Sequence, residues 1–143
     1  MNSSVKFLAA AALMTSALSA VPAQAAEVRG VSVTKGHGWV TVNVSAAGGG
    51  FRVHELPVGN AAYRSIAIDV PGYISGGLEP KAKTPVNEGL VGQVRVKQMG
   101  GTVRIYVDVL SFPKYSFSQN GSGLSLSIDS YHMRDSDPTR PRR

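Results

Sequence analysis

Cationic and aromatic side chains alternate with apolar ones along VRVKQMGGTVRIYVDV, the stretch from Val94 to Val109. Valine and isoleucine at every second position on both sides of the Gly-Gly pair predict a β-hairpin, because glycine tolerates the positive φ of a tight turn. The intervening side chains are expected on the face that points away from the core: Arg95, Lys97, Arg104, Tyr106 and Asp108. Guanidinium groups and an aromatic ring together suit a polymer that carries both carboxylates and sugar rings.

Two registers of this hairpin are open. A two-residue loop sets Lys97 opposite Arg104 and Arg95 opposite Tyr106, whereas a four-residue loop sets Arg95 opposite Arg104. Arg104 therefore faces another cation in either register, which is unfavourable by a few tenths of a kcal/mol. Asp108, two positions beyond Tyr106, is expected to relieve part of that repulsion. Charged side chains on a sheet face can serve solubility alone, but the cluster with Tyr106 favours binding.

Trp39 is the only tryptophan of the chain. It lies in the stretch VSVTKGHGWVTV, which predicts an earlier hairpin, and its strand parity places it outside the core. Two roles stay open for it: an aromatic contribution to the binding surface, or a cap on one end of the fold.

Residues 1–25 have the features of a cleavable signal peptide. Lys6 forms a short positive region, Phe7 to Leu18 an apolar region too short to span a bilayer, and Ala23 to Ala25 a cleavage site of small residues. No later apolar run is long enough for a transmembrane segment. We therefore expect an exported, periplasmic protein.

The composition excludes several kinds of chemistry. With no cysteine, the chain has no disulfide, no thiolate metal site and no cysteine nucleophile. His37, His54 and His132 lack the spacing of a zinc site. We expect no enzymatic activity, metal or cofactor, and a hydrolase without a known motif is the least favoured alternative. A net charge of +6 favours an anionic partner, and export argues against nucleic acid.

The chain after the signal peptide contains two similar halves, about 28–70 and 91–129, offset by about 63 positions. Period-2 patterns predict an all-β fold, a β-sandwich of two short antiparallel sheets with an internal two-fold pseudo-repeat. Residues 26–130 would form this domain, the proline-rich residues 71–90 a connecting loop, and residues 131–143 a disordered basic tail. The expected strands lie near 28–34, 39–45, 50–56, 63–70, 91–98, 102–109, 114–119 and 123–129.

YRSIAIDVPG, from Tyr63 to Gly72, followed by VGQVRVKQMGGTVRIYVDV, from Val91 to Val109, resembles the AMIN domain family. The family pattern is a strand ending in Arg-x-x-x-Asp-apolar-Pro-Gly, a spacer, Val-Arg-x-Gly-Gln, and a second Arg-x-x-x-Asp strand. The resemblance covers about residues 27–130. It implies a periplasmic β-sandwich of the kind that targets N-acetylmuramoyl-L-alanine amidases and type IV pilus secretins to peptidoglycan, often at division sites or poles.

The family's motif residues carry over one by one. Arg95 and Gln98 match the Val-Arg-x-Gly-Gln element, Arg104 and Asp108 match the second Arg-x-x-x-Asp, and Asp69 matches the first motif's aspartate. The chain departs from the pattern at two positions. Ser65 stands where the first motif has arginine, which predicts a weakened first binding face. Lys97 stands where the family has a small residue, which adds a charge to the second face.

The sequence thus predicts a non-enzymatic exported module that recognises peptidoglycan and localises itself or an amidase or secretin partner to the cell wall. The alternative is a protein-docking component of a type IV pilus, secretin or division assembly, in which a sheet edge pairs with a partner strand. The residues expected to bind peptidoglycan are Trp39, Asp69, Arg95, Lys97, Gln98, Arg104, Tyr106 and Asp108.

Overall fold

The computed structural model describes residues 25–48, 50–58, 63–78 and 82–134. The signal peptide expected at residues 1–25 lies outside these ranges except for Ala25, and so does the tail from residue 135 onward. No helix within the described ranges is long and apolar enough to cross a membrane.

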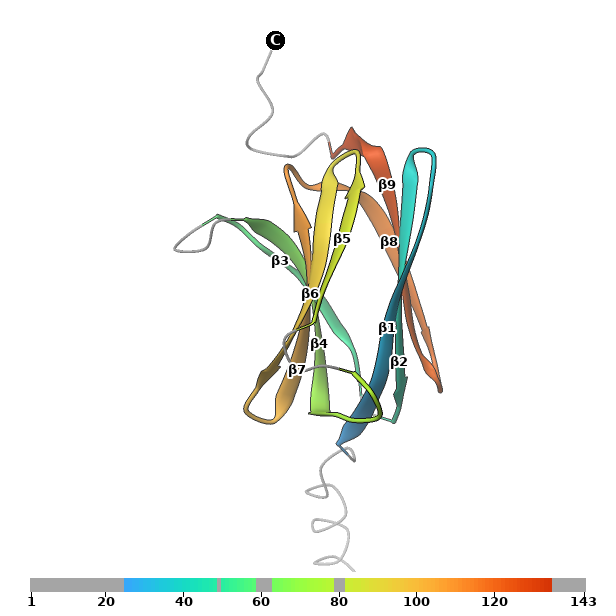
Figure 1. Cartoon of the computed structure of the whole chain (residues 1–143), viewed down its shortest axis with the longest axis vertical. Helices are drawn as coiled ribbons and strands as arrows, with labels where there is room; N and C mark the ends of the chain where they lie inside the picture. The colour runs from blue at the N-terminus through green and yellow to red at the C-terminus, as the bar shows by residue number, and fades with distance from the viewer. Residues whose placement is uncertain (1–24, 49, 59–62, 79–81, 135–143) are drawn as a thin grey trace, which may run out of the picture.

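The described residues form nine strands and no helix (Figure 1). All-β structure was expected from the period-2 patterns and is confirmed. The strands are β1 (Ala26–Gly36), β2 (Trp39–Ala47), β3 (Arg52–Leu56), β4 (Arg64–Ile74), β5 (Lys83–Glu88), β6 (Val91–Met99), β7 (Thr102–Val109), β8 (Pro113–Asn120) and β9 (Gly123–Met133).

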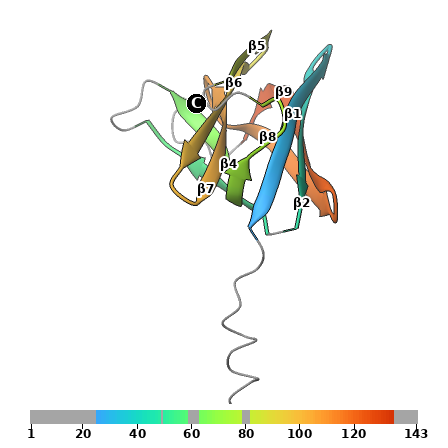
Figure 2. The same cartoon turned by 60° about the horizontal axis from the view of Figure 1, so that its bottom comes forward.

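The strands are hydrogen-bonded as one sheet in the order β5-β6-β7-β4-β1-β2-β9-β8, with β3 paired to β4. The two separate antiparallel sheets that the sequence predicted are therefore not what the hydrogen bonding gives. A short parallel joint, Ala26–Val28 of β1 against Gly72–Ile74 of β4, links the two runs. Beyond this joint the β1-β2-β9-β8 layer faces the layer of β3 to β7 (Figures 1 and 2).

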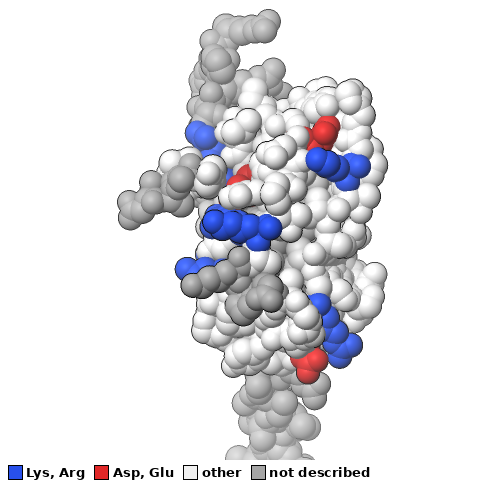
Figure 3. All heavy atoms as spheres, viewed as in Figure 1, with Lys and Arg blue, Asp and Glu red and all other residues white. Residues whose placement is uncertain are grey.

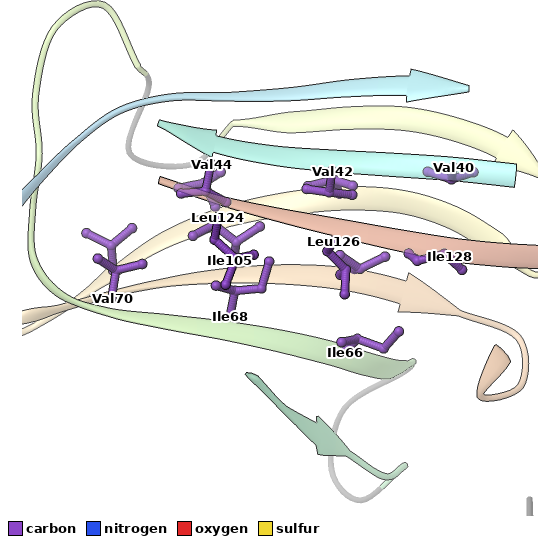
Figure 4. Close-up of a cluster of buried hydrophobic side chains, with 14 of the residues drawn as sticks. Val40, Val42, Val44, Ile66, Ile68, Val70, Ile105, Leu124, Leu126 and Ile128 are labelled. Atoms are coloured by element: carbon purple, nitrogen blue, oxygen red, sulfur yellow. The ribbon is translucent and has the colours of Figure 1, made fainter. Parts of the chain in front are cut away.

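Apolar side chains from the two layers meet between them (Figure 4). Valine at every second position of β2 supplies Val40, Val42 and Val44, and all three are buried. Ile66 and Ile68 of β4 are fully buried in the same cluster. Because strand side chains alternate between faces, the residues between these apolar positions are directed to the outer face of each layer.

The prediction of a loop over residues 71–90 is wrong, because two parts of this segment are strands. β4 continues to Ile74, and Lys83–Glu88 forms β5, which pairs with β6. β5 is an edge strand with Pro85 and a register shift, where a missing N–H is tolerated. Val86 is buried and anchors the strand. Lys35 Nζ donates a 2.6 Å hydrogen bond to its carbonyl oxygen, which ties β1 to β5.

The boundary expected after residue 130 is also displaced. β9 runs to Met133, so Tyr131 and His132 belong to a strand and not to a disordered tail. Leu90 N donates a 2.7 Å hydrogen bond to Ser130 O, and this contact holds the end of β9 against the β5-β6 turn.

Gly72 occupies the joint between the two layers. Its φ is +154°, and a Cβ there would lie 1.9 Å from Ala26 O. We expect Gly72→Ala to separate β1 from β4 and to lower the free energy of unfolding by about 1–3 kcal/mol or more, as overpacking does. Gly30→Ala is the matched control, because a Cβ at Gly30 meets nothing within 4 Å. Urea denaturation of both variants measures the difference, and equal midpoints would contradict this account of the joint.

Candidate functional site

The β6-β7 hairpin adopts the two-residue register. Met99 is the register partner of Thr102, which sets Lys97 opposite Arg104 and Arg95 opposite Tyr106. Gly100 has a φ of +57° at the turn. The repulsion between Lys97 and Arg104 is therefore built into the hairpin.

Arg104 is held by a carboxylate from the neighbouring strand. Asp69 of β4 is its register partner, and the guanidinium donates from Nε to Oδ1 at 2.7 Å and from Nη2 to Oδ2 at 3.1 Å. His54 of β3 places Nε2 2.7 Å from the same Oδ2. The expectation that Asp108 offsets the charge of Arg104 is wrong, because Asp69 does so.

Asp108 binds Arg95 instead. The Arg95 guanidinium donates from Nε to Oδ2 at 2.6 Å and from Nη2 to Oδ1 at 2.9 Å. Ser65 Oγ and Gln93 Nε2 donate to the same carboxylate at 2.6 and 2.7 Å. With 1% of its surface exposed, Asp108 is buried although it lies on the outer face. This carboxylate is therefore satisfied by the protein and is not free to contact a ligand.

The two segments that match Arg-x-x-x-Asp, residues 65–69 and 104–108, lie on adjacent antiparallel strands and share one face. The sequence had suggested two separate faces. Asp69 is the register partner of Arg104, and Ser65 that of Asp108. Since position 65 holds serine, Arg95 of β6 supplies the guanidinium for Asp108. We call this surface, formed by Asp69, Arg95, Lys97, Arg104, Tyr106 and Asp108, the charged face.

The arginines keep both carboxylates ionised. Burial alone would raise the pKa of Asp69, but hydrogen bonds and charge from Arg104 and His54 bring that pKa below its ordinary value. Burial likewise acts to raise the pKa of Asp108, and hydrogen bonds from Arg95, Ser65 and Gln93 outweigh it, so this pKa is also lowered.

Tyr106 lies between the two ion pairs. The Arg95 guanidinium carbon lies over its ring at 4.3 Å from the centroid, and that of Arg104 at 5.8 Å. Both distances are within the range of a cation–π interaction. Arg95 thus occupies part of the ring surface that was expected to pack on a sugar.

Two lysines of the charged face have no carboxylate partner among the described residues. Lys97 lies on β6, and Lys83 on β5 is the register partner of Arg95. Both lysines are exposed, and neither forms a salt bridge among the described residues. Together with Arg95, Tyr106, Ala82 and Val96 they line a hollow of about 230 Å³. Lys83 was missed because its strand was read as a loop, and we now include it in the charged face.

Gln98 and Trp39 do not join this site. The Gln98 amide accepts from Ile74 N at 3.0 Å and donates to Gly72 O and Gly100 O at 3.0 and 2.7 Å, so it fastens the hairpin turn to the end of β4. Trp39 begins β2 in the opposite layer, with 45% of its surface exposed. It therefore cannot share a ligand-binding surface with Tyr106.

His54 was considered in the sequence only as a metal ligand, and the structure places it half-buried against Asp69. The sequence showed that His54 lies two residues from Arg52 on an expected strand. It did not show that this strand pairs with β4. In the ranges that the structure describes, no three histidine or carboxylate side chains are grouped so that they could hold a metal ion.

Comparison with known proteins found no matching family model, no curated protein and no solved structure with significant similarity to this chain. The resemblance to AMIN domains therefore depends on the sequence motifs alone.

The Arg95–Asp108 pair makes a first prediction about stability. Arg95→Ala leaves a buried carboxylate without its bidentate partner, and we expect the free energy of unfolding to fall by about 3–5 kcal/mol. Lys97→Ala removes an exposed cation from the same strand and should change stability by less than about 0.5 kcal/mol. Urea denaturation measures both variants. A similar small effect of the two would show that the pair does not stabilise the fold.

The two aspartates also predict acid sensitivity. Their pKa values are lower in the folded chain than in the unfolded one, so the unfolded state binds more protons as the pH falls. Their contribution is complete above about pH 5 and is lost as the pH falls through the folded pKa values. We expect the urea midpoint to drop below that pH, and to drop less in Asp69→Asn. A midpoint that stays constant down to about pH 2 would be inconsistent with these pairs.

Proposed function

We propose that this protein is a non-enzymatic, exported module that binds peptidoglycan through the charged face and so localises itself or a partner protein to the cell wall. The hollow between Lys83, Lys97, Arg95 and Tyr106 carries the proposal, because it combines unpaired cations with an aromatic side chain. Peptidoglycan offers the matching chemistry, namely peptide-stem and muramyl carboxylates beside sugar rings.

The ion pairs give the arginines of this face a fixed orientation. Each guanidinium has five N–H donors and uses two of its nitrogens on its aspartate. The remaining donors are held in place before a ligand arrives, which lowers the entropy cost of binding. Lys83 and Lys97 supply the net positive charge, since the charges of Arg95 and Arg104 are compensated.

Charge on the side of the molecule shown in Figure 3 is local and not a continuous basic field. In the view of Figure 3 the lysine and arginine side chains form separate groups on a largely uncharged surface. This distribution supports recognition of particular carboxylates over general attraction to any polyanion, which would fade with salt.

The strand order supports the finer assignment of an AMIN-type sandwich with a pseudo-repeat. The β1-β2 hairpin pairs with β9, and the β6-β7 hairpin pairs with β4, so each hairpin joins strands from the other half of the chain. The periplasmic location is part of the same proposal and depends on the leader at residues 1–25.

Co-sedimentation with purified sacculi at physiological salt tests the charged face. We expect Lys97→Glu to reduce pelleting at least fivefold, because it reverses a charge beside the hollow without touching an ion pair. Arg29→Glu is the control on β1: Arg29 is a surface cation with 63% of its side chain exposed, and its pair with the exposed Glu27 at 3.3 Å is a surface contact of little energy. Equal loss in both variants would leave only general charge attraction. Release of muropeptides from the sacculi would contradict the non-enzymatic assignment.

A protein-docking role in a type IV pilus, secretin or division assembly is the second candidate. β8 is an edge strand whose outer hydrogen-bonding side has no partner strand among the described residues, and Phe117 on it is 48% exposed. An extended partner segment can add to such an edge. Recovery of one defined partner from wall-free periplasmic extract, lost on Phe117→Lys but kept in Lys97→Glu, would favour docking over wall binding.

A further inference from the structure

The outer face of the β1-β2-β9-β8 layer is a regular array of small polar side chains. The strand registers align Thr34, Thr41, Ser127 and Ser116 in one row across the four strands. The next row holds Ser32, Asn43, Ser125 and Ser118. We call this surface the hydroxyl face, and it is opposite in chemistry to the charged face.

The hydroxyl face is nearly free of charge. At the register positions of this face, from Gly36 to Gly30 and across to β8, Lys114 and Asp129 are the only lysine, arginine or acidic residues, and they are register partners of opposite sign. His132 Nδ1 also lies 2.9 Å from Asp129 Oδ1. Because the serine and threonine side chains are short, a ligand can approach the backbone of the sheet closely. Groups that both donate and accept hydrogen bonds match a polyhydroxylated ligand.

Two aromatic rings stand at one end of this face in fixed positions. A Cβ at Gly36 would lie 2.3 Å from Trp39 Cε2, so the indole lies directly on the Gly36 backbone. Tyr131 lies against Gly38 in the same way, 3.3 Å from the position of a Cβ, and His37 meets its ring edge-on at 5.3 Å between centroids. Trp39 and Tyr131 remain 45% and 48% exposed. Glycine thus supports one side of the indole and leaves an exposed surface for stacking.

Two shallow, open hollows lie on this face. One of about 820 Å³ includes Trp39, Thr41, Ser127 and Tyr131, and one of about 510 Å³ includes Ser32, Asn43 and Ser125. The strand positions from Trp39 to Ser45 span about 20 Å at about 3.3 Å per residue. This length accommodates several sugar rings in a row.

We propose that the hydroxyl face binds an uncharged glycan chain, with one sugar ring stacked on Trp39 and the chain running along β2 and β9 past Thr41, Ser127 and Asn43. A sugar ring has an apolar face that packs on an indole, and hydroxyls at its rim that bond to serine, threonine and asparagine. A strongly anionic ligand finds no cluster of cations here, because Lys114 is the only lysine or arginine at the register positions of this face and Asp129 is its register partner. The proposal does not depend on wall binding by the charged face.

Trp39 is itself the probe for this binding, because it is the only tryptophan in the chain. Titration of the protein with chitohexaose, an uncharged β-linked hexasaccharide, should change the tryptophan emission in a saturable way. The change should persist at high salt, since no charge pairing is involved. Ser127→Arg places a long charged side chain at an exposed position in the middle of the array, and we expect it to weaken the affinity at least tenfold.

Lys97→Glu is the control on the opposite layer and should bind chitohexaose as the unaltered protein does. Because Lys97→Glu is expected to reduce sacculus pelleting, the two experiments separate the two faces. No change in emission at millimolar chitohexaose would overturn the proposal, and so would equal affinity in Ser127→Arg with unchanged folding by circular dichroism. Weak binding by Lys97→Glu but not by Ser127→Arg would place the sugar on the charged face instead and would equally overturn it.

Discussion

Asp108 is the constraint from which the charged face is built. A carboxylate buried on the outer side of a sheet has to be hydrogen-bonded and charge-compensated, because removing an ion from water costs several kcal/mol. Ser65, Gln93 and Arg95 meet this requirement from β4 and β6, on both sides of β7. Arg95 is drawn over Tyr106 as a result, and this ion pair fixes the guanidinium group that lines the hollow. The proposed wall binding and the stability of the fold are therefore coupled at Arg95 and separable at Lys97.

The sequence contained most of the secondary structure and little of the pairing between distant strands. Alternation of valine and isoleucine predicted eight of the nine strands, since period 2 is a local signal. β5 was missed because Pro85 and the surrounding glycines read as a loop, whereas an edge strand tolerates proline. The site residues were found as a group, but their roles were not. Asp69 and Arg104 are 35 positions apart, and only the pairing of β4 with β7 brings them together.

The two outer faces differ in the forces that they offer. The charged face combines fixed guanidinium groups with unpaired lysines, and its attraction extends over about 10 Å before salt screens it. The hydroxyl face acts only at contact, through hydrogen bonds and the Trp39 ring. A wall polymer carries both charged peptides and uncharged sugars, so the two faces would engage different chemical parts of one material. Two weak contacts on one rigid body bind more strongly together than either does alone, provided that the geometry lets both form.

The pairing of β2 with β9 also sets the order in which the chain is able to fold. Val42 and Leu126 are register partners although most of the described chain lies between them. The β1-β2 hairpin can form early, but the edge of β2 that pairs with β9 has no partner until β9 has been synthesised. The β1-β2-β9-β8 layer therefore cannot be completed before the end of the chain is available, and non-local pairing of this kind is slow. A fold whose second layer is completed only by its final strands leaves one side of its apolar core uncovered until synthesis ends.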